Sequence, residues 1–124
     1  MYKIIVTDIT VKQYRVVCLV KVEGNKYSDQ NLADNLLKLM PNLANHKCKN
    51  NLGENFLQVM HNTSLPHLLE HMIIDIQSKS TQKALFGTTE WVDEQQGIAK
   101  IELSYEDDLH CLEAIKQAVE IINS

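Results

Sequence analysis

Apolar and polar residues alternate in two segments near the amino terminus. Every second residue from Val16 to Val22 is a valine or a cysteine, so these side chains fall on one face of an extended chain. The preceding segment, residues 2–7, is also rich in β-branched residues. The two segments are predicted to pair as a β-hairpin with one buried face.

Three other segments place apolar residues three and four positions apart, which is typical of amphipathic helices. The first lies between Ser28, as its cap, and Pro41, which stops it. The second begins in residues 63–66, where threonine and serine offer cap oxygens and proline suits a first turn, and the third occupies residues 106–122. The apolar positions are Leu32, Leu36, Leu37 and Met40, then Leu65, Leu68, Leu69, Met72, Ile73 and Ile76, then Leu109, Leu112, Ile115, Val119 and Ile122.

The remaining segments complete a predicted order of ββαβαββα. Residues 56–60 and 84–86 are interpreted as short strands, residues 87–97 as a turn region, and residues 99–105 as a half-buried strand. This order predicts an α+β fold, a two-layer sandwich with helices packed on a mainly antiparallel sheet. At 124 residues and 44% apolar content, residues 1–124 are expected to form a single domain.

Composition excludes several classes of partner. The net charge of −4, with scattered basic residues, argues against nucleic acid. An apolar run of membrane-spanning length and a signal-peptide pattern are both missing from the sequence, so a cytoplasmic protein is expected. Cys18, Cys48 and Cys111 are widely spaced and are interpreted as reduced thiols.

The second predicted helix carries the pattern H-x-x-E-H at His67, Glu70 and His71. Two histidines four residues apart on a helix can reach one metal ion, and the glutamate can act as a general base, which is how inverted zincins are built. On a wheel of about 100° per residue the three lie opposite the apolar stripe. They are therefore not expected to be buried in the core. The alternative is that they form the ordinary polar face of an amphipathic helix.

A third ligand would have to come from another element. Glu106, Glu113 and Glu120 are spaced by seven and share one stripe of the last helix. If that helix packs beside the motif helix, Glu113 is the first choice and Glu106 the second, the alternative being that all three are solvated. His46 and Gln77 are further candidates to contact or replace a ligand.

The sequence resembles the amino-terminal domain of cyanophycin synthetases over about residues 36–122. The matching residues, in order, are Leu39–Leu43, His46–Cys48, Phe56, Thr63–Gln77, Phe86–Gly87 and Tyr105. In cyanophycin synthetases this domain precedes two synthetic modules that build an arginine and aspartate polymer. The chain contains neither module and lacks a Gly-rich phosphate loop, so ligation is not implied.

The resemblance implies roles for individual residues. His67 and His71 would ligate zinc, Glu70 would be the base, and Glu113 would be the third ligand, because some members resemble metallopeptidases of the inverted-zincin type. His46 and Cys48 match an H-x-C element of the family; they either line the site or hold the loop, and the structural role is favoured for both. Arginines usually follow the Phe-Gly pair, whereas residues 88–90 here are Thr-Thr-Glu. A substrate other than cyanophycin is therefore expected.

Two functional hypotheses follow from the sequence. The first is a zinc-dependent peptidase or amidase, binding one zinc ion, that acts on a small peptide or peptide-like polymer by the H-x-x-E-H mechanism. The second is a non-catalytic peptide-binding or assembly domain that retains the motif, for which a homodimer surface is one location. The first predicts bound metal, and the second predicts none.

Overall fold

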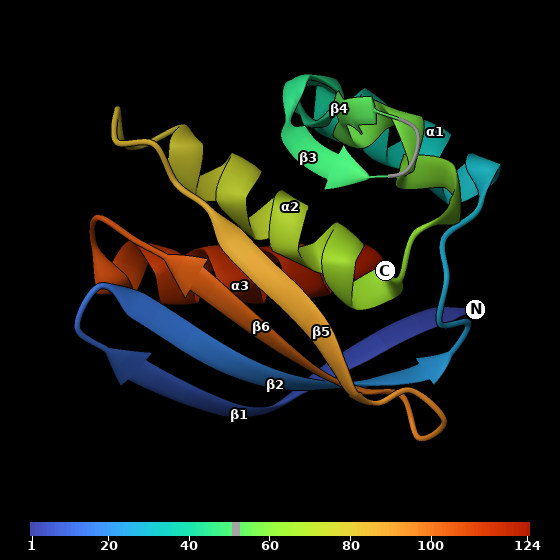
Figure 1. Ribbon diagram of the computed structural model, residues 1–124, viewed down its shortest axis with the longest axis horizontal. Helices are drawn as coiled ribbons and strands as arrows, with labels where there is room; N and C mark the ends of the chain where they lie inside the picture. The colour runs from blue at the N-terminus through green and yellow to red at the C-terminus, as the bar shows by residue number, and fades with distance from the viewer. Residues whose placement is uncertain (51–52) are drawn as a thin grey trace.

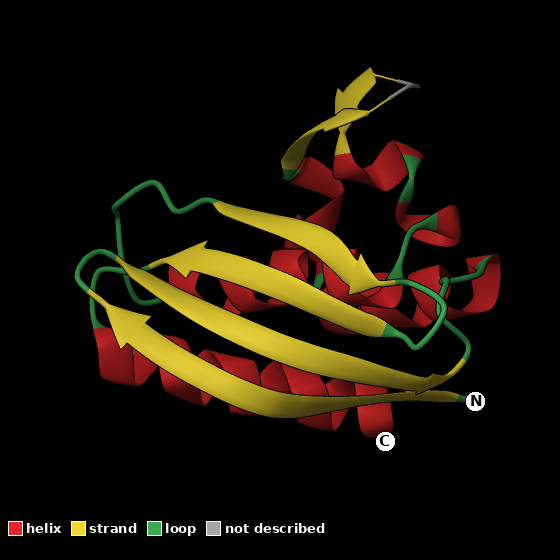
Figure 2. Ribbon diagram, turned by 60° about the horizontal axis from the view of Figure 1, so that its bottom comes forward, coloured by secondary structure: helices red, strands yellow, loops and turns green. Residues whose placement is uncertain are grey.

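A four-stranded antiparallel sheet and two helices packed on one of its faces form the main body of the protein (Figures 1 and 2). The structure is a computed structural model that describes the backbone of residues 1–50 and 53–124 and the side chains outside residues 49–54. The strands are ordered β1-β2-β6-β5, and every neighbouring pair is antiparallel. The predicted α+β sandwich is confirmed.

The bounds of the elements differ from the prediction in several places. The strands of the main sheet are β1 (Tyr2–Lys12), β2 (Arg15–Gly24), β5 (Gly87–Asp93) and β6 (Ile98–Ser104). The helices are α1 (Gln30–Leu39), α2 (Leu65–Ser78) and α3 (Asp108–Asn123). A separate two-stranded sheet is formed by β3 (Lys47–Asn50) and β4 (Gly53–Asn55), among the 3₁₀ turns η1 (Pro41–Asn45), η2 (Phe56–Gln58) and η3 (Met60–Asn62).

The predicted hairpin of β1 and β2 is confirmed, and so is its buried face. Val16, Cys18, Val20 and Val22 are all at most 4% exposed. They face α2 and α3, whose buried residues complete the core: Leu65, Leu68, Leu69, Met72 and Ile73 from α2, and Cys111, Ala114, Ile115, Ala118 and Ile122 from α3. Among the described residues, none of the helices combines the length and apolar character needed to cross a bilayer.

Five local predictions are wrong. Residues 56–60 are 3₁₀ turns and not a strand, and residues 84–86 form a loop, since β5 begins at Gly87 and occupies most of the predicted turn region. Asp29, not Ser28, caps α1, because its carboxylate accepts a hydrogen bond from the backbone N–H of Leu32 at 2.8 Å. Leu109 was expected in the core but is 71% exposed, because it lies in the first turn of α3.

Candidate metal centre

Helix α2 places the H-x-x-E-H motif in its first two turns. Ser64 caps the helix, its hydroxyl accepting a hydrogen bond from the His67 N–H at 3.2 Å, and Pro66 occupies the first turn. Because proline has no N–H and a fixed φ, it suits this position. The apolar stripe of α2 packs on the sheet, so the motif is directed away from the sheet's centre.

The motif face of α2 is nevertheless buried, which corrects the expectation that it lies outside the core. Glu70 and His71 are each 5% exposed. The ring of Phe56 stacks on His71 with centroids 3.8 Å apart, and its plane meets the His67 ring nearly edge-on at 5.3 Å. The segment between α1 and α2 thus folds over the polar face, which a helical wheel of α2 alone does not reveal.

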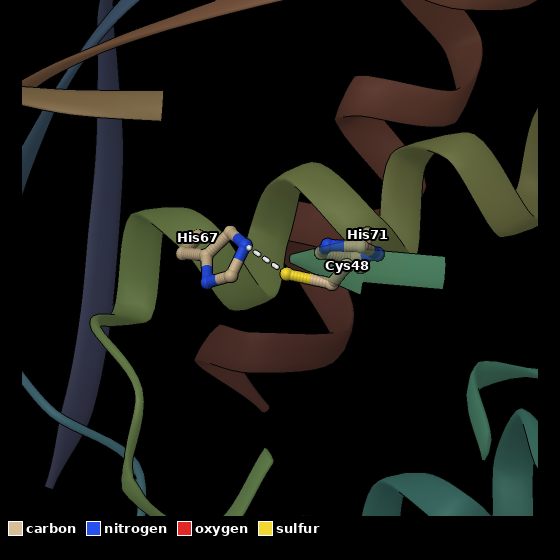
Figure 3. A group of neighbouring side chains, drawn as sticks. All are labelled: Cys48, His67 and His71. Atoms are coloured by element: carbon tan, nitrogen blue, oxygen red, sulfur yellow. Dashed lines mark hydrogen bonds between the residues drawn. The ribbon is translucent and has the colours of Figure 1, made fainter. Parts of the chain in front are cut away.

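Cys48, from β3, lies against the two motif histidines (Figure 3). Its Sγ is 3.5 Å from His67 Nε2. One donor atom each from Cys48, His67 and His71 lies within 4.8 Å of the other two. Three metal-ligating side chains from two elements therefore converge on one point.

The other ring nitrogens of both histidines have polar partners. His67 Nδ1 is 2.8 Å from the hydroxyl of Thr63. His71 Nδ1 is 3.1 Å from Nδ1 of His46, and His46 Nε2 is 3.3 Å from Oδ1 of Asp75. With Nδ1 engaged, His67 directs its Nε2 at Cys48 Sγ, and Nε2 of His71 lies 3.9 Å from Glu70 Oε2. Outer partners of this kind are usual for histidines that ligate metals.

Glu70 is held beside the same point from the side of β5. The Thr89 hydroxyl donates a 2.6 Å hydrogen bond to Oε1, while Oε2 lies 3.9 Å from His71 Nε2. Gly87 makes room for the carboxylate, since a Cβ there would be 3.0 Å from Glu70 Cγ and 2.8 Å from the Glu102 carbonyl oxygen. One oxygen of Glu70 is fixed and the other is directed at the donor cluster.

Burial sets the protonation states of the cluster. It lowers the pKa of His71 to about 3, with the nearby His67 and His46 adding to the effect, and it also lowers the pKa of His67. Burial raises the pKa of Glu70 against the Thr89 hydrogen bond and the nearby His46, which lower it. Burial and the charge of Glu70 raise the pKa of the Cys48 thiol. At neutral pH both imidazoles are thus neutral, the form that binds metal, whereas the thiol must lose its proton on binding.

The cluster opens into a cavity of about 600 Å³ between α2, β3 and the start of β5. Cys48, His67, Glu70 and His71 line one part of it, and residues 85–89 line another. A molecule the size of a short peptide segment fits such a volume.

A comparison with family models matches residues 15–124 to the cyanophycin synthase-like N-terminal domain. This match covers most of the chain, including every residue of the cluster. The chain belongs to this family. A comparison with curated proteins gave no match.

In this cyanophycin synthase-like domain the structure does not bring Glu113 to the motif. Glu113 is exposed on α3 and accepts a hydrogen bond from Gln117, four residues on, at 3.3 Å. Figure 1 shows α3 and the β3–β4 hairpin on opposite sides of α2, and the motif faces the hairpin. Glu113 and Glu120 share an exposed face of α3, Glu106 precedes the helix, and none of the three belongs to the described group of side chains that could hold a metal ion, so the structure gives no support to Glu113 as third ligand.

The other candidates are also separated from the donor cluster. Glu106 is exposed beyond the end of β6 and lines a different, shallow depression with residues 78–82. Gln77 is buried, but its amide donates to the Ser104 carbonyl at 3.3 Å. Neither contacts His67 or His71 through any hydrogen bond or ion pair between described residues.

His46, a candidate to contact or replace a ligand, and Cys48, whose role was left open with a structural one favoured, both line the cavity and contact the motif histidines. Three further residues were missed. Thr63 precedes His67 by four positions, a spacing that could have indicated the contact with its ring. Asp75 follows His71 by four and carried the same signal, whereas no pattern in the sequence links Thr89 to Glu70.

Proposed function

We propose that this domain is a zinc-dependent hydrolase of peptide or amide bonds, with Cys48, His67 and His71 as the protein ligands. The observation that carries the proposal is the convergence of these three side chains on one point, beside a glutamate carboxylate and at the wall of a cavity. Three protein ligands and an open fourth position are typical of catalytic zinc sites.

The donor set fits zinc. Thiolate and imidazole ligands suit zinc, and in a tetrahedral site a sulfur and a nitrogen ligand are about 3.5 Å apart. The separation of Cys48 Sγ and His67 Nε2 is 3.5 Å. The two imidazoles are neutral at pH 7, so Cys48 is the one ligand of the three that must lose a proton when the metal binds.

Glu70 supplies the acid and base chemistry of the proposal. When bound, zinc lowers the pKa of a coordinated water and polarises a carbonyl group. Glu70 would accept the proton of the attacking water at Oε2, the oxygen that Thr89 leaves open, and return it to the leaving nitrogen. Because burial raises the pKa of the Glu70 carboxyl, this pKa lies closer to neutral pH, which favours both taking up and returning the proton.

The substrate class is a small peptide or peptide-like polymer. The cavity runs from the donor cluster to the first residues of β5, and its volume of about 600 Å³ suits a short peptide segment. Membership of a family named for cyanophycin synthase makes an amino-acid polymer one substrate to test. Thr88 and Thr89 provide hydroxyls at this wall, whereas Glu90 is paired with Lys100 at 2.9 Å and is not part of the cavity lining.

Metal analysis and a hydrolysis assay test the proposal together. The protein should retain about one equivalent of zinc, and His67→Ala and Cys48→Ala should each lose it. His61→Ala, at an exposed histidine outside the cluster, and Glu113→Ala should keep it. Glu70→Gln should keep zinc while losing at least about 100-fold in hydrolysis of short synthetic peptides, because the base contributes about 10²–10⁴-fold.

Two results would contradict the proposal. Zinc occupancy that survives both His67→Ala and Cys48→Ala would show that the metal binds elsewhere. Bound zinc without any Glu70-dependent hydrolysis across the peptide set would instead favour the second hypothesis, a peptide-binding domain that retains the motif.

A further inference from the structure

We propose that the free edge of β1 is a dimerisation surface, which binds β1 of a second copy of this chain as an antiparallel strand across a twofold axis at Thr10. β1 is an outermost strand of the main sheet, and Figures 1 and 2 show it along the edge opposite to β5. The donor cluster lies beside β5, at the other edge. The proposal is therefore independent of the proposed function.

The register with β2 shows which residues of β1 direct their backbone groups out of the sheet. Val22 of β2 donates its N–H to the carbonyl of Gly97 at 2.8 Å, so its backbone groups point toward β6 and away from β1. The residues of β2 that pair with Ile9 and Val11 are four and six positions before Val22, and alternate residues of a strand point the same way. The N–H and C=O groups of Ile9 and Val11 therefore point outward from the edge.

The first half of this edge already has a partner. Asn123, at the end of α3, accepts a hydrogen bond from the Ile4 N–H at 2.8 Å and donates one to the Ile4 carbonyl at 2.9 Å, as a neighbouring strand would. A bulge follows between Val6 and Asp8, where the register with β2 shifts. Devices of this kind protect an edge strand from pairing. Within the part of the chain that the structure describes, no side chain caps residues 8–12 in the same way.

Apolar side chains accompany this open half of the edge. Ile9 and Val11 share the helix-covered face of the sheet with their buried partners on β2, yet they remain 40% and 44% exposed. Leu109, in the first turn of α3, is 71% exposed. Figure 1 shows that α3 begins near the end of β1 where these residues lie. A second strand added here would therefore cover apolar surface as well as backbone groups.

The charges of this half select a second copy as the occupant. With the axis at Thr10, Ile9 of each copy faces Val11 of the other, and the two residues exchange a pair of backbone hydrogen bonds. Asp8 then faces Lys12 of the other copy, at a position where opposite side chains are closest. Both are exposed, and neither forms an ion pair with any described residue. Opposite charges in such cross-strand pairs stabilise a sheet, and like charges destabilise it.

Neighbouring registers do not align these charges. An axis at Ile9 also lets outward backbone groups meet, but it places Asp8 opposite Thr10. An axis at Val11 places Lys12 opposite Thr10. The axis at Thr10 therefore satisfies both the backbone groups and the charges. Because the same patch is used on both copies, the assembly closes at a dimer.

Sedimentation equilibrium of the full chain tests the proposal. The molar mass of the wild type should rise from 14.2 kDa toward twice that value between micromolar and millimolar concentration. Asp8→Lys and Lys12→Asp should each weaken dimerisation at least about 10-fold, because two attractive pairs become repulsive. The double variant, with both changes in one chain, should dimerise as the wild type does. An equimolar mixture of the two single variants should form a heterodimer, since its facing charges are again opposite.

Lys83→Asp is the matched control. It makes the same change of charge as Lys12→Asp in an exposed loop outside β1, so dimerisation should match the wild type. Amide hydrogen exchange of the wild type, followed by NMR, gives a second measurement. Protection of Ile9 and Val11 should increase with protein concentration, whereas protection of Val6, which also points outward but precedes the bulge, should not.

Three results would overturn the proposal. The wild type could remain at 14.2 kDa up to millimolar concentration. It could dimerise with the same affinity in both single variants, or the double variant and the mixture could fail to restore the dimer. Either outcome would exclude pairing about Thr10. If a variant does not fold, the concentration dependence of exchange at Ile9 and Val11 in the wild type decides.

Discussion

Individual residues around Glu70 show how β5 positions a side chain of α2. Thr89 fixes one carboxylate oxygen, and Gly87 lets the carboxylate lie against the strand. The sequence interpretation placed this glycine in a turn, yet its lack of a side chain is what leaves room for Glu70. Sequence patterns identify glycine readily but do not say whether it serves a turn or a close approach.

Thr89→Val should raise the pKa of Glu70 further. The threonine hydroxyl donates to the carboxylate at 2.6 Å, which stabilises the charged form and lowers the pKa. Valine has the same shape but no donor. Carboxyl-carbon chemical shifts of Glu70, followed by NMR as a function of pH in metal-free protein, measure the change directly. Thr10→Val, at an exposed position of β1, should leave the Glu70 titration as it is. An unaltered titration in Thr89→Val would show that the hydroxyl does not act on Glu70.

At the scale of secondary-structure elements, the sequence predicts those that have strong periodicity. Helix α2, the hairpin of β1 and β2, and β6 follow from apolar spacing, because their buried residues recur at 3.6 or 2 positions. The segment between α1 and α2 does not, since its short strands and 3₁₀ turns have too few residues to establish a period. This segment supplies Cys48, Phe56 and His46. The periodicity of the sequence therefore identified the motif residues of α2, but it did not show that these three residues cover them.

Phe56 attaches this irregular segment to α2. It is fully buried and packs on both motif histidines. Phe56→Ala should lower the free energy of unfolding of the metal-free protein by about 3–5 kcal/mol, the usual loss for a buried phenylalanine. Urea unfolding followed by circular dichroism measures it. The adjacent Leu57 is 47% exposed, so Leu57→Ala should change stability by no more than about 0.5 kcal/mol. Similar losses in the two variants would mean that the stacking on His71 contributes little.

At the scale of the whole molecule, the residue that can serve as third ligand depends on which element packs against the motif face of α2. Helical periodicity correctly showed that Glu113 and Glu120 share an exposed face of α3, whereas Glu106 lies before this helix begins at Asp108. It could not show which element that face meets. The motif face of α2 is covered by the β3–β4 hairpin and not by α3, a tertiary relation that comes from the connection of α1 to α2 (Figure 1). The proposed third ligand, Cys48, therefore comes from the segment that precedes α2 in the chain.

Burial of neutral histidines makes the stability of the metal-free protein depend on pH. The pKa of His71 is lowered from 6.5 to about 3 in the folded state, so between these values the unfolded chain binds a proton that the folded protein does not. Stability from this residue is present above pH 6.5 and is lost as pH falls toward 3. At pH 5 the loss is up to about 2 kcal/mol, at 1.36 kcal/mol per pH unit. Glu70 acts in the opposite direction, because its raised pKa lets the folded state hold a proton above pH 4.5, and it offsets part of the loss.

Urea unfolding at pH 7, 6 and 5 in the presence of a chelator should therefore show decreasing stability for the wild type. Glu70→Gln should show a steeper decrease, since the opposing group is gone. His71→Gln should show a shallower one, whatever its stability at pH 7, because the residue with the largest shift no longer titrates. Replacing the exposed His110 by glutamine should leave the slope unchanged. Equal slopes for the wild type and His71→Gln would mean that His71 takes up its proton over the same pH range in the folded and unfolded states, so that burial does not lower its pKa.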